Sequence, residues 1–307
     1  MALDRGRYTV DVDGRLVVAM RARELGRRGV VVVGDRVALV GDLSAARGSL
    51  ARIVRVEERS SVLMRTADDD DTTAEGRVER VVVANADQLV IVSALADPPP
   101  RTGFIDRCLV AAYDAEIDPL LLLTKADLAA PDAILDYYAD LDLPYVLTRP
   151  GADLGPLTAE LAGRVSVMIG HSGVGKSTLV NRLVPDADRR VGAVSAVGKG
   201  RHTSTSVVAL PLPEPRSWII DTPGIRSFGL AHVSADSLLH GFPDLVQGST
   251  ACPPNCDHTG TSGDCGLDAL VATGKADPRR LASFRRLLAS QSGAVEDADG
   301  ADNYTST

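Results

Sequence analysis

The chain has 307 residues, of which 45% are hydrophobic and 24% charged, and its net charge is −8. This length allows two or three domains with a substantial core, and the lack of a long apolar run argues against a membrane protein. No apolar signal segment follows the N-terminal charges, and three of the four cysteines cluster, which favours a metal site over a disulfide framework. We therefore expect a cytoplasmic protein without membrane association.

The segment 1–66 predicts a small β-barrel of the OB-fold type. Five Val-rich stretches with strand-like patterns fall at residues 8–12, 16–20, 29–33, 37–41 and 50–56. The segment contains thirteen arginines and eight acidic residues, so it has an excess of five positive charges while the rest of the chain carries −13. Such a surface is either an ordinary solvated face or a binding site for a polyanion such as RNA, and charge alone does not separate the two.

A different pattern begins near residue 80. The acidic run 68–71 marks a boundary, and residues 67–79 are predicted to be a linker. Apolar strands are then expected at residues 88–93, 120–123, 145–147, 165–169 and 218–220. Helices are expected at residues 104–115, 132–138 and 178–183. Continuous apolar strands that alternate with helices predict an α/β domain over 80–232 with a mostly parallel sheet.

A phosphate-binding loop is predicted between the strand 165–169 and the helix 178–183. Glycines in the pattern G-x-x-x-x-G-K-S leave successive backbone N–H groups free to surround phosphates. Lys176 supplies a cation for the outer phosphates, and the Ser177 hydroxyl is a ligand for Mg²⁺. The residues assigned to the phosphates are Gly170, His171, Ser172, Gly173, Val174, Gly175, Lys176, Ser177 and Thr178.

A base-recognition tetrad is predicted directly after the strand 120–123. It consists of Thr124, Lys125, Ala126 and Asp127. The Asp127 carboxylate can accept two hydrogen bonds from the N1–H and 2-amino groups of guanine, which adenine does not offer, while Lys125 can lie along the base. Thr124, Lys125 and Asp127 are assigned to GTP binding. A second near-match, residues 274–277, follows no strand and receives no role.

The metal-side motif is Asp221-Thr222-Pro223-Gly224, directly after the strand 218–220. Asp221 is assigned to a Mg²⁺-bound water and the Gly224 N–H to the γ-phosphate. The polar segment before it contributes Thr203 or Thr205 to the magnesium shell, and the residues do not decide which. Ile225 cannot orient the attacking water as a glutamine would, so His202 is the hypothesis for that role. Catalysis is thus assigned to His202, Lys176 and Asp221.

The order of the three motifs indicates a circular permutation. The base tetrad precedes the phosphate loop, whereas an ordinary Ras-like GTPase has the tetrad last. The same sheet can be wired in this order when the original termini lie close together. One consequence is that the metal-side motif leads directly into the C-terminal part of the chain.

A structural zinc site is predicted in that part. Its ligands are Cys252, Cys256, His258 and Cys265, a Cys₃His set within fourteen residues. One Zn²⁺ would stabilise a helical domain over 233–290, with helices at 266–273 and 278–290. The last helix is expected to turn Arg279, Arg280, Arg285 and Arg286 away from its apolar face. Residues 291–307 are acidic and predicted to be disordered.

Taken together, these features resemble the ribosome small-subunit-dependent GTPase A (RsgA) family. Local matches are Asn85-Ala86-Asp87-Gln88, Phe104-Ile105-Asp106-Arg107 and Gly200-Arg201-His202-Thr203. The resemblance implies a bacterial cytoplasmic GTPase that binds the small ribosomal subunit, hydrolyses GTP in response and acts late in subunit maturation. It also supports the role of His202.

The sequence departs from the family pattern at three places. Thr124 stands where Asn is commoner, and the metal ligands are spaced C-x3-C-x-H-x6-C where the family more often has gaps of four and five. The Ser-Ala motif beside the base is poorly matched around Thr148-Arg149.

Three functions follow as alternatives. The leading one is a GTPase that acts as an assembly checkpoint on rRNA, bound through the barrel and the last helix, with Zn²⁺ and Mg²⁺ as cofactors and a monomeric state. A second is an RNA-binding module in which hydrolysis only times release. A third, a P-loop ATPase or kinase, is disfavoured by Asp127.

Overall fold

The computed structural model describes residues 2–4, 6–26, 30–46, 48–66, 79–184, 207–222, 230, 233–260 and 263–291. Two compact units make up the chain. The first contains Met1–Leu63, Val81–Val92 and Gly151–Arg226, and the second contains Met64–Arg80, Ser93–Pro150 and Ser227–Thr307. In the described part of the chain, no helix is long and apolar enough to cross a membrane.

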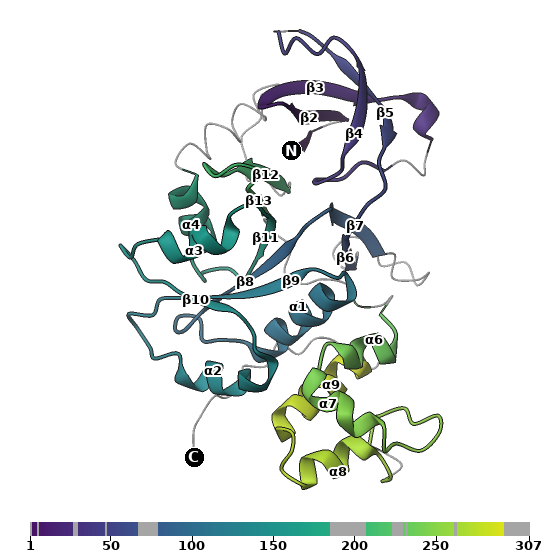
Figure 1. Cartoon of the computed structure of the whole chain (residues 1–307), viewed down its shortest axis with the longest axis vertical. Coiled ribbons are helices and arrows are strands. Elements are labelled where there is room, and N and C mark those ends of the chain that lie inside the picture. The colour runs from purple at the N-terminus through teal and green to yellow at the C-terminus, as the bar shows by residue number, and fades with distance from the viewer. Residues whose placement is uncertain are drawn as a thin grey trace. The chain divides into compact units, whose positions relative to one another are not determined.

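The N-terminal segment of the first unit forms a five-stranded sheet of order β1-β2-β3-β5-β4 (Figure 1). Neighbouring strands are antiparallel except β3 and β5, which run parallel with Ala19 opposite Ala51. The alternation of apolar and polar residues directs one face of the sheet into a core of Val17, Ala19, Val31, Ala51 and Ile53. The elements are β1 (Ala2–Asp4), β2 (Arg7–Val12), β3 (Arg15–Arg21), the 3₁₀ helix η1 (Arg23–Leu25), β4 (Val37–Gly41) and β5 (Ala51–Val56).

A closed OB-fold barrel is not confirmed. Among the described residues β1 pairs with β2 alone and β4 with β5 alone, so the sheet is open. The strand expected at 29–33 is wrong: residues 30–32 have no strand pairing, and Val33 makes an isolated bridge to Val83. The Asp35 carboxylate accepts the Val32 N–H at 2.8 Å and so fixes a turn there. The valines follow a strand-like pattern because Val31 and Val33 are buried in the core.

The predicted linker at 67–79 lies almost wholly outside the described residues. On either side of it, β6 (Val62–Thr66) and β7 (Glu79–Ala84) form a two-stranded sheet that the sequence patterns do not predict. Asn85, which follows β7, has a left-handed backbone with φ of 54°. Its side chain accepts the Ser60 N–H at 2.8 Å and donates to the Gly34 carbonyl at 3.0 Å, which joins three segments of the first unit.

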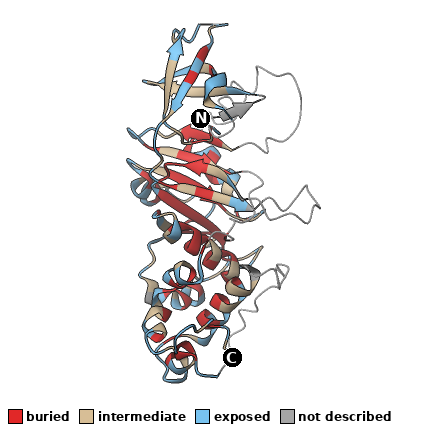
Figure 2. Ribbon diagram, turned by 90° about the vertical axis from the view of Figure 1, so that its right-hand side faces the viewer, coloured by how far each residue is buried: buried red, intermediate tan, exposed pale blue. Residues whose placement is uncertain are grey.

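Parallel strands form the rest of the first unit, as the apolar runs predict. The strand β11 (Val165–Ile169) pairs in parallel with β8 (Gln88–Ala94) and with β13 (Trp218–Asp221). The edge strand β12 (Val208–Pro211) is antiparallel to β13. Buried residues run along these strands (Figure 2). Among the described residues, this part of the unit contains the α-helices α3 (Gly155–Leu161) and α4 (Lys176–Leu183).

The second unit combines two parallel strands with a group of helices (Figure 1). The strand β9 (Asp118–Thr124) pairs with β10 (Tyr145–Leu147), with Leu122 opposite Val146. The helices of this part are α1 (Thr102–Asp114), α2 (Asp132–Tyr137), the 3₁₀ helix η2 (Ala139–Leu141), α6 (Ala235–His240), α7 (Pro243–Ser249), α8 (Gly266–Ala272) and α9 (Pro278–Gln291). The helix α1 packs against α6 and α9, and α8 packs against α7 and α9.

The arginines of α9 differ from their prediction. Arg280 was expected on the solvent face, yet its side chain is 2% exposed. It lies beside two carboxylates, those of Asp106 and Asp244, which compensate the cost of burying its charge. Arg279 pairs with Asp277 and Arg285 with Asp268, so both of these carry an acidic partner at the surface.

Candidate functional site

The predicted phosphate loop lies between β11 and α4. Gly173 and Gly175 have φ of 84° and 94°, a left-handed backbone that favours glycine, and Gly175 caps the N-terminus of α4. A Cβ at Gly170 would lie 2.6 Å from the Val92 carbonyl oxygen, so this position also requires glycine. Val174 is buried, while Ser172 and Gly173 are exposed. The loop therefore depends on glycine at three positions, as the predicted phosphate-binding pattern requires, and its contact with phosphates stays a prediction.

Two separately predicted residues, Lys176 and Asp221, meet in the first unit. Lys176 is the first residue of α4 and Asp221 the last of β13, and the lysine ammonium donates to the carboxylate. Their side chains are 12% and 23% exposed. The Thr222 hydroxyl donates to the Met168 carbonyl at 2.8 Å, which holds the chain after β13 against β11. The arrangement puts a cation and a carboxylate side by side at the start of α4.

The base tetrad follows β9 in the second unit. Lys125 has φ of 55°, and its ammonium contacts the Asp97 carbonyl oxygen. Thr124 is buried, and its hydroxyl donates to the Ser93 carbonyl at 3.4 Å. Asp127 is exposed, and its contact with guanine stays a prediction. Thr124 thus bonds the end of the neighbouring strand, and its contact with a nucleotide stays a prediction.

A second segment, after β10, holds the tetrad from its other side. The Thr148 N–H donates to the Leu123 carbonyl at 2.8 Å, and the Ala126 N–H donates to the Thr148 carbonyl at 3.1 Å. The Thr148 hydroxyl oxygen is buried and has no hydrogen-bond partner among the described residues. This position has no side-chain motif in the sequence, because its role depends on a backbone pairing.

Four predicted site residues lie outside the described part of the chain. They are His202, Thr203, Thr205 and Gly224. Their assignments to water, magnesium and the γ-phosphate stay predictions, as do the roles of the described loop residues.

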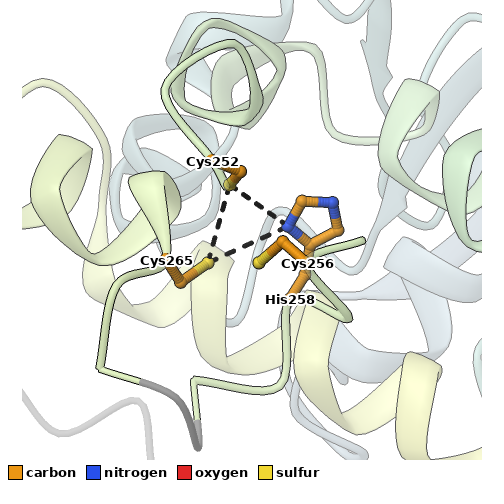
Figure 3. Close-up of side chains that lie close together, drawn as sticks. All are labelled: Cys252, Cys256, His258 and Cys265. Carbon is orange, nitrogen blue, oxygen red and sulfur yellow. Dashed lines mark hydrogen bonds between the residues drawn. The ribbon is translucent and has the colours of Figure 1, made fainter. Parts of the chain in front are cut away.

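The four predicted metal ligands come together in the second unit. Their side chains point toward one another, and their ligand atoms all lie within 4.8 Å of one another (Figure 3). The Cys252 sulfur lies 3.5 Å from His258 Nδ1 and 4.0 Å from the Cys265 sulfur, and the Cys265 sulfur lies 3.8 Å from His258 Nδ1. A tetrahedral Zn²⁺ with bonds of about 2.3 Å to sulfur and 2.0 Å to nitrogen separates its ligands by roughly 3.5–3.8 Å. The donor set therefore fits one tetrahedral ion.

The surroundings of the cluster fix its ligands. The Gly266 N–H donates to the Cys252 sulfur at 3.2 Å, and a Cβ at Gly266 would lie 2.2 Å from the Gly248 carbonyl oxygen. Arg285 Nε donates to the His258 carbonyl at 2.9 Å while its two terminal nitrogens bind Asp268. Burial raises the pKa of Cys252 to about 11, so a bound cation has to displace the thiol proton. Cys265 and His258 are buried, and Cys252 and Cys256 are half-buried.

Known proteins resemble this chain at the level of family and fold. A family model described as RsgA GTPase matches residues 56–231, more than half of the chain. The chain belongs to the RsgA GTPase family. The small ribosomal subunit biogenesis GTPase RsgA of Pseudomonas aeruginosa is 43% identical over 219 residues, which cover 68% of this chain and 64% of that protein. The RsgA of Chlorobaculum parvum is 36% identical over 268 residues, which cover 85% of each chain.

Two solved structures share the fold. YjeQ from Thermotoga maritima has a TM-score of 0.70 at 24% identity and covers 94% of each chain. YloQ, which is described as a circularly permuted GTPase, has a TM-score of 0.66 at 20% identity and covers 95% of this chain and 93% of its own. The permutation predicted from the order of the motifs is confirmed. The RsgA resemblance drawn from the motifs is likewise confirmed. The match to the Pseudomonas relative spans less than two thirds of that protein's length.

Proposed function

We propose that this RsgA family member is a GTP hydrolase that acts in the maturation of the small ribosomal subunit. The observation that carries the proposal is the contact between Lys176 and Asp221, because it joins the phosphate-loop lysine to a metal-binding carboxylate. Family membership and the names of the relatives support the same activity.

The residues have distinct roles in this proposal. Asp127 selects guanine and Lys125 supports the base. Residues 170–178 hold the phosphates, and the Gly224 N–H meets the γ-phosphate. Ser177, Asp221 and either Thr203 or Thr205 would hold a Mg²⁺ ion, which would neutralise charge on the transferred phosphoryl group. His202 orients the attacking water.

The Cys₃His cluster holds one structural Zn²⁺ in this proposal. A closed four-ligand site offers no position for a substrate, so the ion stabilises a fold rather than catalysing a reaction. We further propose the domain division 1–66, 67–79, 80–232, 233–290 and 291–307, with the first domain binding RNA.

The outward face of the N-terminal sheet supports binding to rRNA. Arg7, Met20, Arg52 and Val40 are exposed and stand in neighbouring register positions on β2, β3, β5 and β4. Guanidinium groups between exposed apolar residues suit phosphates and unstacked bases. The helix α9 carries less of this role than the sequence predicted, since Arg280 is buried. The protein would act as a cytoplasmic monomer.

Turnover of GTP and ATP, with and without purified small ribosomal subunits, tests the proposal. We expect slow GTP hydrolysis that the subunits stimulate, and no comparable ATP hydrolysis. Equal turnover of both nucleotides contradicts the proposal. His202→Ala should lose the stimulated turnover while binding GTP normally, and unchanged turnover would remove His202 from the mechanism.

Binding to the subunit should weaken as salt is raised, because phosphate contacts release counterions. Cosedimentation of the protein with subunits at increasing KCl measures this. Salt-independent binding would argue against the rRNA contact.

A further inference from the structure

A buried ionic cluster in the second unit joins helices that are far apart in sequence. The Arg280 guanidinium binds the Asp106 carboxylate at 2.5 Å and both oxygens of Asp244 at 3.2 Å. Tyr138 and Ser283 donate their hydroxyl hydrogens to the same Asp106 carboxylate. This Arg280 cluster (Asp106, Tyr138, Asp244, Arg280 and Ser283) therefore connects α1, the turn after α2, α7 and α9.

The cluster is sealed from solvent. Exposed fractions are 2% for Arg280, 1% for Asp106 and 0% for Ser283. The Phe242 ring lies under the guanidinium with its centroid at 4.4 Å, and the Tyr138 ring lies at 5.5 Å. A helix shift that separated Arg280 from its carboxylates would leave buried charges without compensation, so the cluster favours the arrangement in which these helices meet.

Through α1, the Arg280 cluster is connected to the base tetrad. The segment directly before α1 carries the groups that hold the tetrad. The Leu95 N–H donates to the Thr124 carbonyl at 3.0 Å, and the Asp97 backbone carbonyl accepts a hydrogen bond from the Lys125 ammonium. Asp106 lies in the second turn of α1. A rotation or shift of α1 would therefore displace the groups that position the tetrad.

Through α7 and α9, the Arg280 cluster is connected to the Cys₃His cluster. Asp244 lies in α7, and the turn after this helix carries Cys252, whose N–H donates to the Ser249 carbonyl at 3.1 Å. One turn beyond Arg280 on α9, the Phe284 ring packs edge-on against His258 at 6.2 Å between centroids. The next residue, Arg285, binds the His258 carbonyl. Both α7 and α9, which meet at Arg280, are thus linked to the metal ligands: Cys252 lies in the turn after α7, and α9 contacts His258.

We propose that Arg280 is a positioning residue that makes α1, α7 and α9 one rigid body, so that metal binding at the Cys₃His cluster and guanine binding at the tetrad strengthen each other. This inference rests on the proposed function. Ordering one end of a rigid body lowers the cost of ordering the other, and such coupling acts equally in both directions.

The test is the affinity of the full chain for Zn²⁺, measured by competition with a chromogenic chelator in the presence and absence of saturating GDP. We expect GDP to tighten Zn²⁺ binding about fivefold or more in the wild type. Arg280→Met should reduce the effect of GDP to less than twofold. The matched control is Arg279→Met, which makes the same change one residue away at a side chain that is 57% exposed and pairs with Asp277. It should behave as the wild type does.

The outcomes separate the two proposals. A wild type that binds no GDP contradicts the proposed function, and this inference with it. A wild type that binds GDP and Zn²⁺ independently overturns the coupling alone, as does a full GDP effect in Arg280→Met. If Arg280→Met does not fold, Arg280→Lys and Ser283→Ala replace it. In a second readout, GDP should slow amide hydrogen exchange over residues 243–258 in the wild type and Arg279→Met but not in these variants.

Discussion

The Cys₃His cluster and the base tetrad belong to the same compact unit but are held in different ways. The metal ligands come from a span of fourteen residues, and their ligand atoms lie within 4.8 Å of one another. The tetrad is positioned from outside, by Ser93 and Asp97 on one side and Thr148 on the other. The residues of one short motif can therefore be positioned within their own segment, while those of another are positioned by distant segments of the chain.

The largest effect should come from breaking the metal cluster. Cys265→Ala removes one of four ligands, and structural Zn²⁺ contributes on the order of 10–16 kcal/mol in small zinc peptides. We expect this variant to lose bound zinc and the helical signal of residues 233–291. Metal analysis and far-UV circular dichroism measure both.

The control for this variant is Cys108→Ala. Cys108 is also a free, buried thiol but lies in α1 outside the cluster. This control should keep one zinc per chain. A Cys265→Ala protein with full zinc content would show that the four residues are not the ligands.

The next largest effect concerns the specificity of the tetrad. Asp127→Asn exchanges an acceptor of the guanine N1–H for an amide, so affinity for GDP should fall by roughly 10²-fold or more while xanthosine diphosphate gains. Asp277→Asn is the matched control, because Lys275-Ala276-Asp277 has the same residues as the last three positions of the tetrad and lies directly before α9. Equal losses of GDP affinity in the two variants would remove the base-reading role of Asp127.

A smaller effect on the free energy of unfolding should distinguish Thr124 from Thr148, which lie on opposite sides of the tetrad's surroundings. Thr124→Val removes the hydroxyl that bonds the Ser93 carbonyl, at a cost of about 1 kcal/mol in unfolding free energy. Thr148→Val replaces a buried hydroxyl without a described partner by a methyl group, so stability should stay the same or rise. Urea unfolding of both variants measures the difference. The reverse order of stabilities would contradict the described hydrogen bonds.

The smallest effect is a pH dependence at the start of α9. The hydrogen bonds of Arg279 lower the pKa of Asp277 below its ordinary value of 3.8. Because the folded-state pKa is the lower one, this contribution to stability is present above pH 3.8 and is lost as the pH falls through the folded pKa. Asp277→Asn should be less stable than the wild type at pH 6 by under about 1 kcal/mol, and the difference should vanish near pH 2. Thermal unfolding at the two pH values checks this.

The sequence predicts the local features of the structure well and the features that depend on distant residues poorly. The metal ligands, the loop 170–178 and the strands 145–147 and 165–169 follow from local patterns, because apolar runs and short spacings carry their signal. The open N-terminal sheet, the β6–β7 pair and the turn at 30–35 depend on partners distant in sequence. Arg280 was assigned to the solvent face for the same reason: its partners, Asp106 and Asp244, lie 174 and 36 residues away. The environment of Thr148 also depends on a strand pairing that no sequence motif predicts.

The most direct test of a guanine-specific tetrad positioned by its neighbours is the equilibrium affinity of the zinc-loaded wild type for GDP and ADP, measured by fluorescence titration. We expect tight binding of GDP and a preference over ADP of roughly 10²-fold or more. Equal affinities for the two nucleotides would contradict it.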